Sequence, residues 1–451
     1  MITAPFNNGF SKCWPIKPFI KLIPPPNVKR YKIIAPNISS IELKFIFIFL
    51  LILTTAVEFY LGHRQKNFVS KNKKKVPSAF TKIIKLADHK KAADYTVSKI
   101  NFNSIELIFG AIILYLFTLG GGINLINNLM GQYFENPLLN GAVIITSIFV
   151  ALHLIGLPSS IYQTFVIETK YGFNKITPKL FITDQIKSVI VMIILSGVVS
   201  FAALWILSEL GNEWWLWLWI FLSVLSLIGV ALAPVLKQLF NKYTPIKDKS
   251  LKKNIEKLLK RCGFESSGLF EMNGSLRSTH GNAFFGGFGK TKRIIFFDTL
   301  LEKLNTKEIE AVIAHELGHF KRNHVKKLLL IQISLIFFSL YFLGGLKENE
   351  AFYNGLGVEN LSNANFLILF ILVLLPFVMF FVGPFISWLQ RKYEFEADEY
   401  ACEFTKSSDL KQSLIKLYRD NASTLTPDPL YSAFYHSHPP ASIRIQAIDK
   451  N

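Results

Sequence analysis

Cysteine is scarce in this sequence. Only three cysteines occur among 451 residues, at Cys13, Cys262 and Cys402, and no two of them form a CxxC pair. We therefore expect neither a disulfide framework nor a cysteine-ligated zinc site. Any zinc ion that the chain binds has to be held by histidines and carboxylates.

Charged residues are also few for the length. They make up 18% of the chain, whereas hydrophobic residues make up 51%, and the mean hydropathy is +0.33. This composition is too apolar for an ordinary soluble protein and favours an integral membrane protein. In a soluble chain the net charge of +19 would suggest nucleic acid binding, but here the lysines lie between long apolar runs. We expect no nucleic acid partner and interpret the charge as the loop bias that orients membrane helices.

The first 40 residues lack the apolar run and the small-residue cleavage site of a signal peptide. They are rich in proline and basic residues. We expect residues 1–40 to form an N-terminal tail that is either disordered or the product of an upstream start codon, and we assign no function to it.

Seven apolar runs are long enough to cross a bilayer, which takes about 20 residues. They fall at 41–62, 104–123, 138–157, 186–208, 214–236, 327–346 and 364–389. The chain is therefore predicted to be a mainly helical membrane protein. Its sizeable soluble segment is the loop between the fifth and sixth runs, residues 237–326.

The loops differ sharply in charge. The first loop, residues 63–101, is rich in lysine, and the third contains Lys170, Lys175 and Lys179, whereas the second (124–137) and the fourth (209–213) contain neither Lys nor Arg. Because cytoplasmic loops carry the excess of basic residues, the odd-numbered loops, including 237–326, are predicted to be cytoplasmic. The basic tail before residue 41 would then lie outside, and we give the loops more weight.

The strongest chemical signal is the motif His315-Glu-Leu-Gly-His319. Residues four apart lie on one face of a helix, so both imidazoles can reach one metal ion. Glu316 lies further round the helix and is better placed to hold a metal-bound water than to ligate. A zinc hydrolase needs this arrangement, because zinc lowers the pKa of its bound water to about 7 and a carboxylate must then move a proton. Apolar residues at helical spacing precede the motif, and Asn305-Thr306 is a candidate helix cap.

A hydrolytic zinc site usually has three protein ligands, so one more is required. The acidic segment after the seventh apolar run is the natural source. Glu394 and Asp398 are four residues apart, so one can ligate while the other hydrogen-bonds a ligand imidazole. Glu396, Glu399 and Glu403 are alternatives, and spacing alone does not choose among them.

The segment 237–326 also contains strand-like patterns. We predict a helix at 252–262 and strands at 268–272 and 293–297. Between the strands, residues 277–289 combine glycines and short polar residues with two adjacent phenylalanines. We interpret this stretch as an edge strand or loop that takes a substrate backbone as an added strand. A plain surface hairpin is an equally good interpretation.

The ordered set of motifs resembles the type I CAAX prenyl endopeptidase family of multi-span membrane zinc metalloproteases. The similarity covers nearly the whole chain after residue 41, and the first 40 residues have no counterpart in it. It rests on residues 157–162, 164–168, 172–175, 240–245, 282–284, 297–300, 315–319, 394–398 and 437–440.

The resemblance implies about seven transmembrane helices forming a chamber, capped by a small α+β zinc metalloprotease domain. Transmembrane helices one to five would occupy 41–236 and helices six and seven 327–389, with the catalytic domain at 237–326 and its C-terminal part at 390–451. It also implies one Zn2+ per chain. By this resemblance, the zinc ligands are His315, His319 and Glu394, and the general base is Glu316. Asp398 would orient a ligand, and Asn282 would contact the substrate backbone. The second wall of the cleft would be formed by His438 and Arg444, which would act as hydrogen-bond donors.

The function implied is hydrolysis of peptide bonds near the C-terminus of CAAX-type lipidated or other membrane-associated polypeptides. The partners are then a polypeptide substrate, prenylated or not, and membrane lipid, and we expect a monomer with a cytoplasmic active site. Two alternatives remain open, a heat-shock-type membrane quality-control zinc protease and a non-catalytic scaffold or transporter with a vestigial metal site. The richness in Ile, Lys, Asn and Phe favours a bacterial inner membrane, or the endoplasmic reticulum membrane if the host is eukaryotic.

Overall fold

The structure is a computed structural model that describes residues 38–131, 133–286 and 292–450. The description below concerns the unit that begins at Ile38. The tail predicted at 1–40 lies outside the described residues except for its last three.

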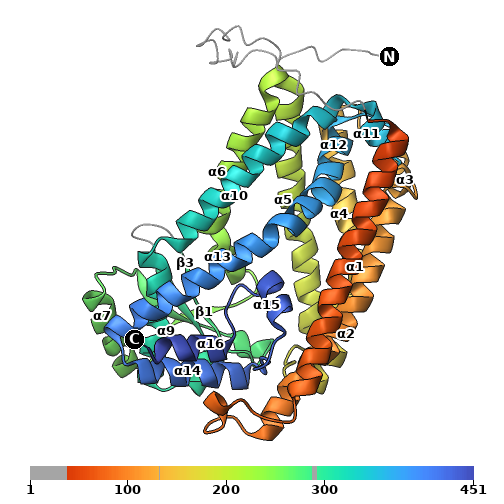
Figure 1. Cartoon of the computed structure of the whole chain (residues 1–451). Coiled ribbons are helices and arrows are strands. Elements are labelled where there is room, and N and C mark those ends of the chain that lie inside the picture. The colour runs from red at the N-terminus through yellow and green to blue at the C-terminus, as the bar shows by residue number, and fades with distance from the viewer. Residues whose placement is uncertain (1–37, 132, 287–291, 451) are drawn as a thin grey trace, which may run out of the picture. The chain divides into compact units, whose positions relative to one another are not determined.

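Within the described residues, seven helical spans are long and apolar enough to cross a membrane, which confirms the predicted number. Figure 1 shows their arrangement. The helices of this part are α1 (Ser40–Asn72), α2 (Leu86–Phe117), α3 (Gly122–Met130), α4 (Pro137–Tyr162), α5 (Pro178–Glu209), α6 (Trp214–Gln238), α10 (His324–Leu343), α11 (Glu350–Gly355), α12 (Asn363–Leu369) and α13 (Leu375–Phe404). A π-helical turn, η2 (Gln163–Glu168), continues α4, and another, η7 (Phe370–Leu374), joins α12 to α13.

Several spans begin at residues that satisfy the first free N–H groups of a helix. Ser39 caps α1 in a capping box with Glu42, and Asn136 and Thr177 cap α4 and α5 directly before a proline. The helical ends were harder to predict than the spans. The segment 63–101 was predicted as a loop, but α1 continues through Asn72 and α2 begins at Leu86. The residues between them, 73–85, contain a short 3-10 turn at Ser78–Phe80. The helices extend into the segment because polar residues continue a helix as well as apolar ones do.

The spans contact one another in succession. α1 packs against α2, α2 against η2, α4 against α5, α5 against α6, and α6 against α10, while α12 contacts α4 and α5. Only 6% of the most apolar stretch of α2 is buried inside the protein, and the share in the α6 span is the same. Most of the surface of these two stretches is therefore open either to lipid or to the interior of the helix set. The low burial is compatible with the predicted chamber.

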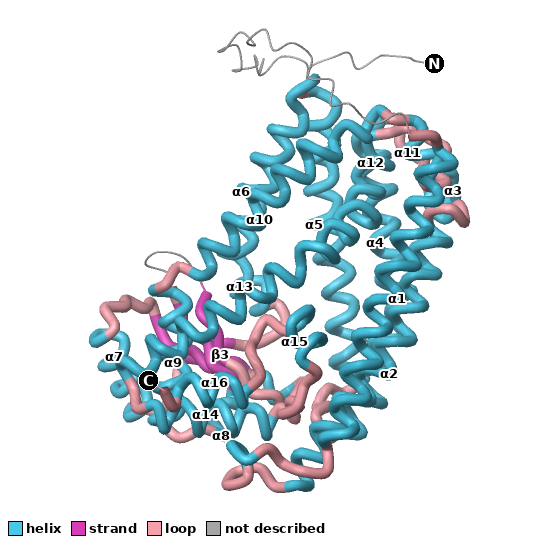
Figure 2. Tube along the Cα trace, in the orientation of Figure 1, coloured by secondary structure: helices cyan, strands magenta, loops and turns pink. Residues whose placement is uncertain are grey.

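Four short strands gather near one end of the spans (Figure 2). They are β1 (Tyr243–Pro245), β2 (Gly268–Met272), β3 (Ala283–Gly286) and β4 (Arg293–Phe297), in the order β1-β2-β4-β3. β2 and β4 are parallel, and the two outer pairs are antiparallel. Both predicted strands are confirmed, and the stretch 277–289 supplies the edge strand β3, which pairs with β4 alone among the described strands.

Helices on the sheet and around it complete the domain. They are α7 (Lys249–Arg261), α8 (Asp298–Lys303), α9 (Thr306–Lys321), α14 (Ser407–Asp420), α15 (Pro429–Tyr435) and α16 (Ala441–Ile448). The helix predicted at 252–262 corresponds to α7, whose apolar face buries Ile255 and Leu258 in one cluster with Ile294 and Phe296 of β4. α14 contacts α9, α15 packs against α13 and α1, and α16 contacts α13 and α14. Residues after the seventh span therefore pack directly on the helix that contains HExxH.

Gly318 allows α9 and α13 to approach closely. A Cβ at Gly318 would lie 2.9 Å from the Cα of Ala397 and 3.1 Å from the Cβ of Tyr400. Since Gly318 precedes His319 and Ala397 precedes Asp398, the missing side chain sets the separation of the two helices that carry the candidate site. The capping box of Asn305 with Glu308 fixes the start of α9, as predicted.

Gly318→Ala should lower the thermal stability of the protein, because a methyl group there overlaps backbone atoms that cannot rotate away; overpacking of this kind costs about 1–3 kcal/mol. The midpoint of thermal unfolding in detergent, followed by tryptophan fluorescence, measures the effect. Gly156→Ala in α4 is the matched control, since nothing lies within 4 Å of a Cβ built there. A midpoint for Gly318→Ala at or above that of the control would contradict the close approach.

Candidate metal centre and active site

His315, His319 and Glu394 come together between α9 and α13. The Nε2 atoms of the two histidines are 3.2 Å apart. Glu394 lies opposite them, with Oε2 3.5 Å from Nε2 of His315 and Oε1 3.2 Å from Nε2 of His319. All the candidate ligand atoms lie within 4.8 Å of one another. The predicted triad is thus brought together by the fold.

This donor set fits a tetrahedral metal ion. Two ligand atoms bonded at about 2.05 Å with a tetrahedral angle between them are about 3.3 Å apart, and the observed separations bracket that value. Glu394 Oε2 is also buried without a hydrogen-bond partner among the described residues, although Arg444 Nη1 faces it as an ion pair at 3.0 Å. An acceptor of this kind has bonding capacity left for a cation.

The other acidic candidates lie elsewhere. Glu396 faces His324, and Glu399 and Glu403 face Arg322 on the surface at 3.5 and 4.0 Å. Among the described acidic residues of this segment, Glu394 is the one that joins both histidines.

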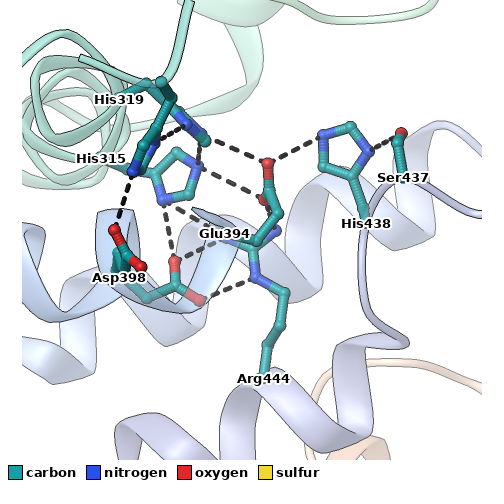
Figure 3. A network of polar contacts seen from close by, with 9 residues as sticks. His315, His319, Glu394, Asp398, Ser437, His438 and Arg444 are labelled. Atoms are coloured by element: carbon teal, nitrogen blue, oxygen red, sulfur yellow. Dashed lines mark hydrogen bonds and ion pairs between the residues drawn. The ribbon is translucent and has the colours of Figure 1, made fainter. Parts of the chain in front are cut away.

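Asp398 and Arg444 support the triad from behind (Figure 3). Nδ1 of His315 lies 2.9 Å from Oδ1 of Asp398, and Arg444 donates to both oxygens of Asp398, from Nε at 2.8 Å and from Nη2 at 2.6 Å. Burial favours a lower pKa for Arg444, but the carboxylates of Asp398 and Glu394 outweigh it and raise the pKa. The guanidinium thus stays charged and is occupied by the two carboxylates.

His319 has a support that the sequence analysis missed. Its Nδ1 lies 2.9 Å from Nδ1 of His324, and Nε2 of His324 lies 3.0 Å from Oε2 of Glu396. The His324 ring is buried and stacks on Tyr393, with centroids 4.1 Å apart and planes at 7°. Both histidines of the motif therefore have a partner for the nitrogen that faces away from the triad.

The sequence contains only a weak signal for His324. It follows His319 by five residues, a spacing that does not share a helix face. The helix ends between them, and Asn323 adopts a left-handed conformation with φ of 57° that starts α10 in a new direction. The contact depends on this turn, which hydrophobic periodicity does not reveal.

A cavity of about 840 Å3 opens beside the triad. Its lining includes Glu316, Glu394, Asn282, His438 and Arg444, together with residues of α1 and α2. Asp398 and His319 are not among the lining residues. Burial raises the pKa of Glu316 above that of an ordinary carboxyl, although the imidazoles of His315 and His319 oppose the shift. This direction moves the carboxyl toward the neutral range in which a proton acceptor works best.

Asn282 and His438 both line this cavity, although they are far apart in the sequence. Asn282 directly precedes β3, and its carbonyl accepts a hydrogen bond from the N–H of Phe297. His438 is 63% exposed and directs Nε2 toward Oε1 of Glu394 at 3.3 Å, while its Nδ1 is 2.9 Å from the hydroxyl of Ser437. An edge strand, two candidate donors and a candidate metal centre thus share one cavity.

Comparison with known proteins links this geometry to a family. Residues 65–242 match the family described as "CAAX prenyl protease N-terminal, five membrane helices", and residues 245–451 match peptidase family M48. The CAAX prenyl protease 1 homolog of Arabidopsis thaliana is 34% identical, over 83% of this chain and 90% of that protein. The homolog from Homo sapiens is 32% identical, over 87% of this chain and 92% of that protein. The crystal structure of S. mikatae Ste24p matches with a TM-score of 0.85 and 30% identity, over 90% of this chain and 99% of that chain.

The relatives match both the membrane spans and the segment with the candidate metal centre, so the similarity is not confined to the HExxH motif. The chain belongs to the type I CAAX prenyl endopeptidases of peptidase family M48, and it is a multi-pass membrane metalloendopeptidase.

Proposed function

We propose that this enzyme uses one zinc ion to hydrolyse peptide bonds near the C-terminus of CAAX-type lipidated or other membrane-associated polypeptides. The observation that supports the proposal best is the cavity, whose lining combines the candidate metal centre with residues of the membrane helices α1 and α2. A substrate anchored in the bilayer by a lipid has to present its peptide at such a junction. The relatives named above as CAAX prenyl proteases support the same substrate class.

In this proposal His315, His319 and Glu394 hold the zinc ion. Two imidazoles and one carboxylate are a usual ligand set for catalytic zinc, which leaves one position open. When bound, the ion supplies a Lewis acid that lowers the pKa of water and polarises the scissile carbonyl. Asp398 orients His315 through Nδ1, and Arg444 fixes Asp398 and Glu394 in place.

The remaining residues move protons and hold the substrate. The Glu316 carboxylate accepts a proton from the attacking water and passes it to the leaving amine nitrogen. Nε2 of His438 donates a hydrogen bond to the oxyanion that develops on the scissile carbonyl. The amide of Asn282 contacts the substrate backbone, which adds to the free edge of β3. Arg444 is buried between two carboxylates, so we assign it to positioning. His438 is exposed to the cavity and would turn its Nε2 from Oε1 of Glu394 to the oxyanion.

The two alternative functions make different demands on the chain. A heat-shock-type quality-control protease would share the metal centre but would not require a lipidated substrate. The non-catalytic scaffold is set aside, because the chain belongs to a metallopeptidase family and Glu316 lines the cavity beside three suitable ligands. Cleavage of a farnesylated peptide by the zinc-loaded protein, compared with its unlipidated counterpart, separates these functions.

Glu316→Gln should leave zinc bound and reduce hydrolysis by at least about 100-fold, because the amide keeps the shape of the side chain but cannot accept a proton. Metal content by mass spectrometry and turnover of a farnesylated peptide are the two measurements. Glu310→Gln, in the same helix but outside the triad, is the control and should retain activity. Wild-type turnover by a zinc-loaded Glu316→Gln protein would rule out Glu316 as the base.

His324→Ala should raise the Kd for Zn2+ about 10- to 100-fold, because His319 loses the partner that orients its ring. Competition with a chelator measures this on the full-length protein. Glu396→Ala, which acts through His324, should give a smaller shift in the same direction, whereas Glu394→Ala should abolish tight binding. Glu399→Ala is the control, since its carboxylate faces the surface of the same helix. An unchanged Kd in His324→Ala would contradict the support of His319.

The active site is proposed to lie on the cytoplasmic side. HExxH precedes the sixth span and Glu394 follows the apolar part of the seventh, so two crossings return the chain to the same side. The lysine-rich first and third loops identify that side as cytoplasmic. The membrane itself stays a prediction, either the bacterial inner membrane or, in a eukaryotic host, the endoplasmic reticulum.

Cysteine labelling tests this orientation in a variant without its three native cysteines. A cysteine at Lys252 should be protected from an impermeant reagent in sealed, cytoplasm-in membranes, and one at Asn360 should react. Both positions are exposed in the structure, so the accessibility of the compartment decides the result. Labelling of the Lys252 site from outside would mean that the orientation is inverted.

A further inference from the structure

One face of α2 is polar where it borders the catalytic cavity. Thr96, Lys99 and Asn103 all line this cavity, and their spacing of three and four residues places them on one side of the helix. The hydroxyl of Thr96 donates to the carbonyl of Ala92 within α2. The side chains of Lys99 and Asn103 have no hydrogen-bond partner among the described residues, so both can donate to a ligand.

Lys99 is a cation that no carboxylate in the described part of the chain pairs with. Among the described residues that line the cavity, the side chains with a permanent positive charge are Lys99 and Arg444, and Arg444 is buried against Asp398 and Glu394. Lys99 has no carboxylate within 4.0 Å in the part of the chain that the structure describes. Its Nζ lies over the ring of Tyr95 at 5.1 Å from the centroid. This contact holds the ammonium by a cation–π interaction and leaves its hydrogens available.

The nearby carboxylate of Glu168 is engaged by other partners. It accepts a hydrogen bond from the Tyr95 hydroxyl at 2.5 Å, and His280 Nε2 lies 3.6 Å away. His280 also stacks on Phe173, and Phe173 packs against Tyr95. The ring of Tyr95, over which Lys99 lies, is therefore held in place by its contacts with Phe173 and Glu168.

We propose that Lys99, assisted by Asn103, binds the free α-carboxylate at the C-terminus of the substrate. This inference rests on the proposed function, because a CAAX sequence is by definition the last four residues of a chain and ends in a carboxylate. A carboxylate that enters a partly desolvated cavity needs a cation and hydrogen-bond donors to replace its water. Lys99 and Asn103, one turn apart, supply an ammonium and an amide NH2. The site would select chain ends over internal segments.

The test compares two farnesylated peptides that differ only at the last group, one ending in a carboxylate and the other in a carboxamide. The zinc-loaded, full-length wild type should have a kcat/KM about 10- to 100-fold higher for the acid than for the amide, as expected for a hydrogen bond to a charged group. Lys99→Met should bring this ratio close to one, mainly by lowering kcat/KM for the acid. Lys99→Arg should retain most of the preference, because it keeps the charge.

Lys91→Met is the matched control. Lys91 lies on the same helix with its Nζ 4.9 Å from the ring centroid of Phe173, but it does not line the catalytic cavity. The acid-to-amide ratio of this variant should equal that of the wild type. An undiminished acid-to-amide ratio in Lys99→Met would overturn the proposal. An equal loss of kcat/KM for both peptides that occurs only in vesicles with anionic lipid would also overturn it, because Lys99 would then bind a phospholipid headgroup.

Binding measurements separate this inference from the proposed function. Fluorescence anisotropy with the Glu316→Gln variant compares the Kd values of the two peptides without turnover, and Lys99→Met in that background should remove the preference for the acid. If the wild type cleaves neither peptide, the proposed function fails. The carboxylate site is then judged separately, by whether the Kd measured by anisotropy is lower for the acid than for the amide. If the wild type cleaves both equally and binds both equally, the carboxylate site fails and the peptidase remains.

Discussion

The close packing of α9 against α13 is the constraint on which the rest of the site depends. HExxH supplies two imidazoles on one helix, but the third candidate ligand is on a helix that returns after two membrane crossings. Gly318 brings the two backbones together without an intervening side chain, so Glu394 reaches both histidines. A site assembled in this way needs the sixth and seventh spans to end in the correct register, which couples the membrane helices to the metal centre.

Arg444 offsets part of the buried negative charge of this assembly. Buried carboxylates are costly unless they are paired and hydrogen-bonded, and here Glu394 and Asp398 are both buried within one turn of α13. Arg444 pairs with both from α16, at 3.0 and 2.6 Å, and its single positive charge offsets one of the two negative charges. The C-terminal helix is thus held against α13 by the same contacts that shape the metal centre. The fold and the site are stabilised by one set of interactions.

The sequence predicted the parts of this protein that local patterns determine. Apolar runs marked the seven spans, Asn305 marked the start of α9, and the spacing of His315 and His319 marked their common face. The choice among the acidic residues of 394–403 required the tertiary packing, since which of them faces α9 depends on how the two helices are rotated. His324 escaped notice because its contact with His319 depends on a left-handed residue at Asn323. The helix ends were misplaced where polar residues extended the spans.

The placement of the cavity explains why one zinc motif serves a specialised membrane peptidase. The proposed ligands, the proposed base Glu316 and the edge strand would act on any extended peptide. The opposite wall is supplied by α1 and α2, with Gln65, Tyr95 and Lys99 among its residues, and a soluble peptidase has no such wall. The membrane helices therefore do more than anchor the catalytic domain. Their side chains complete the cavity, so we expect residues of α1 and α2 to contribute to substrate selectivity.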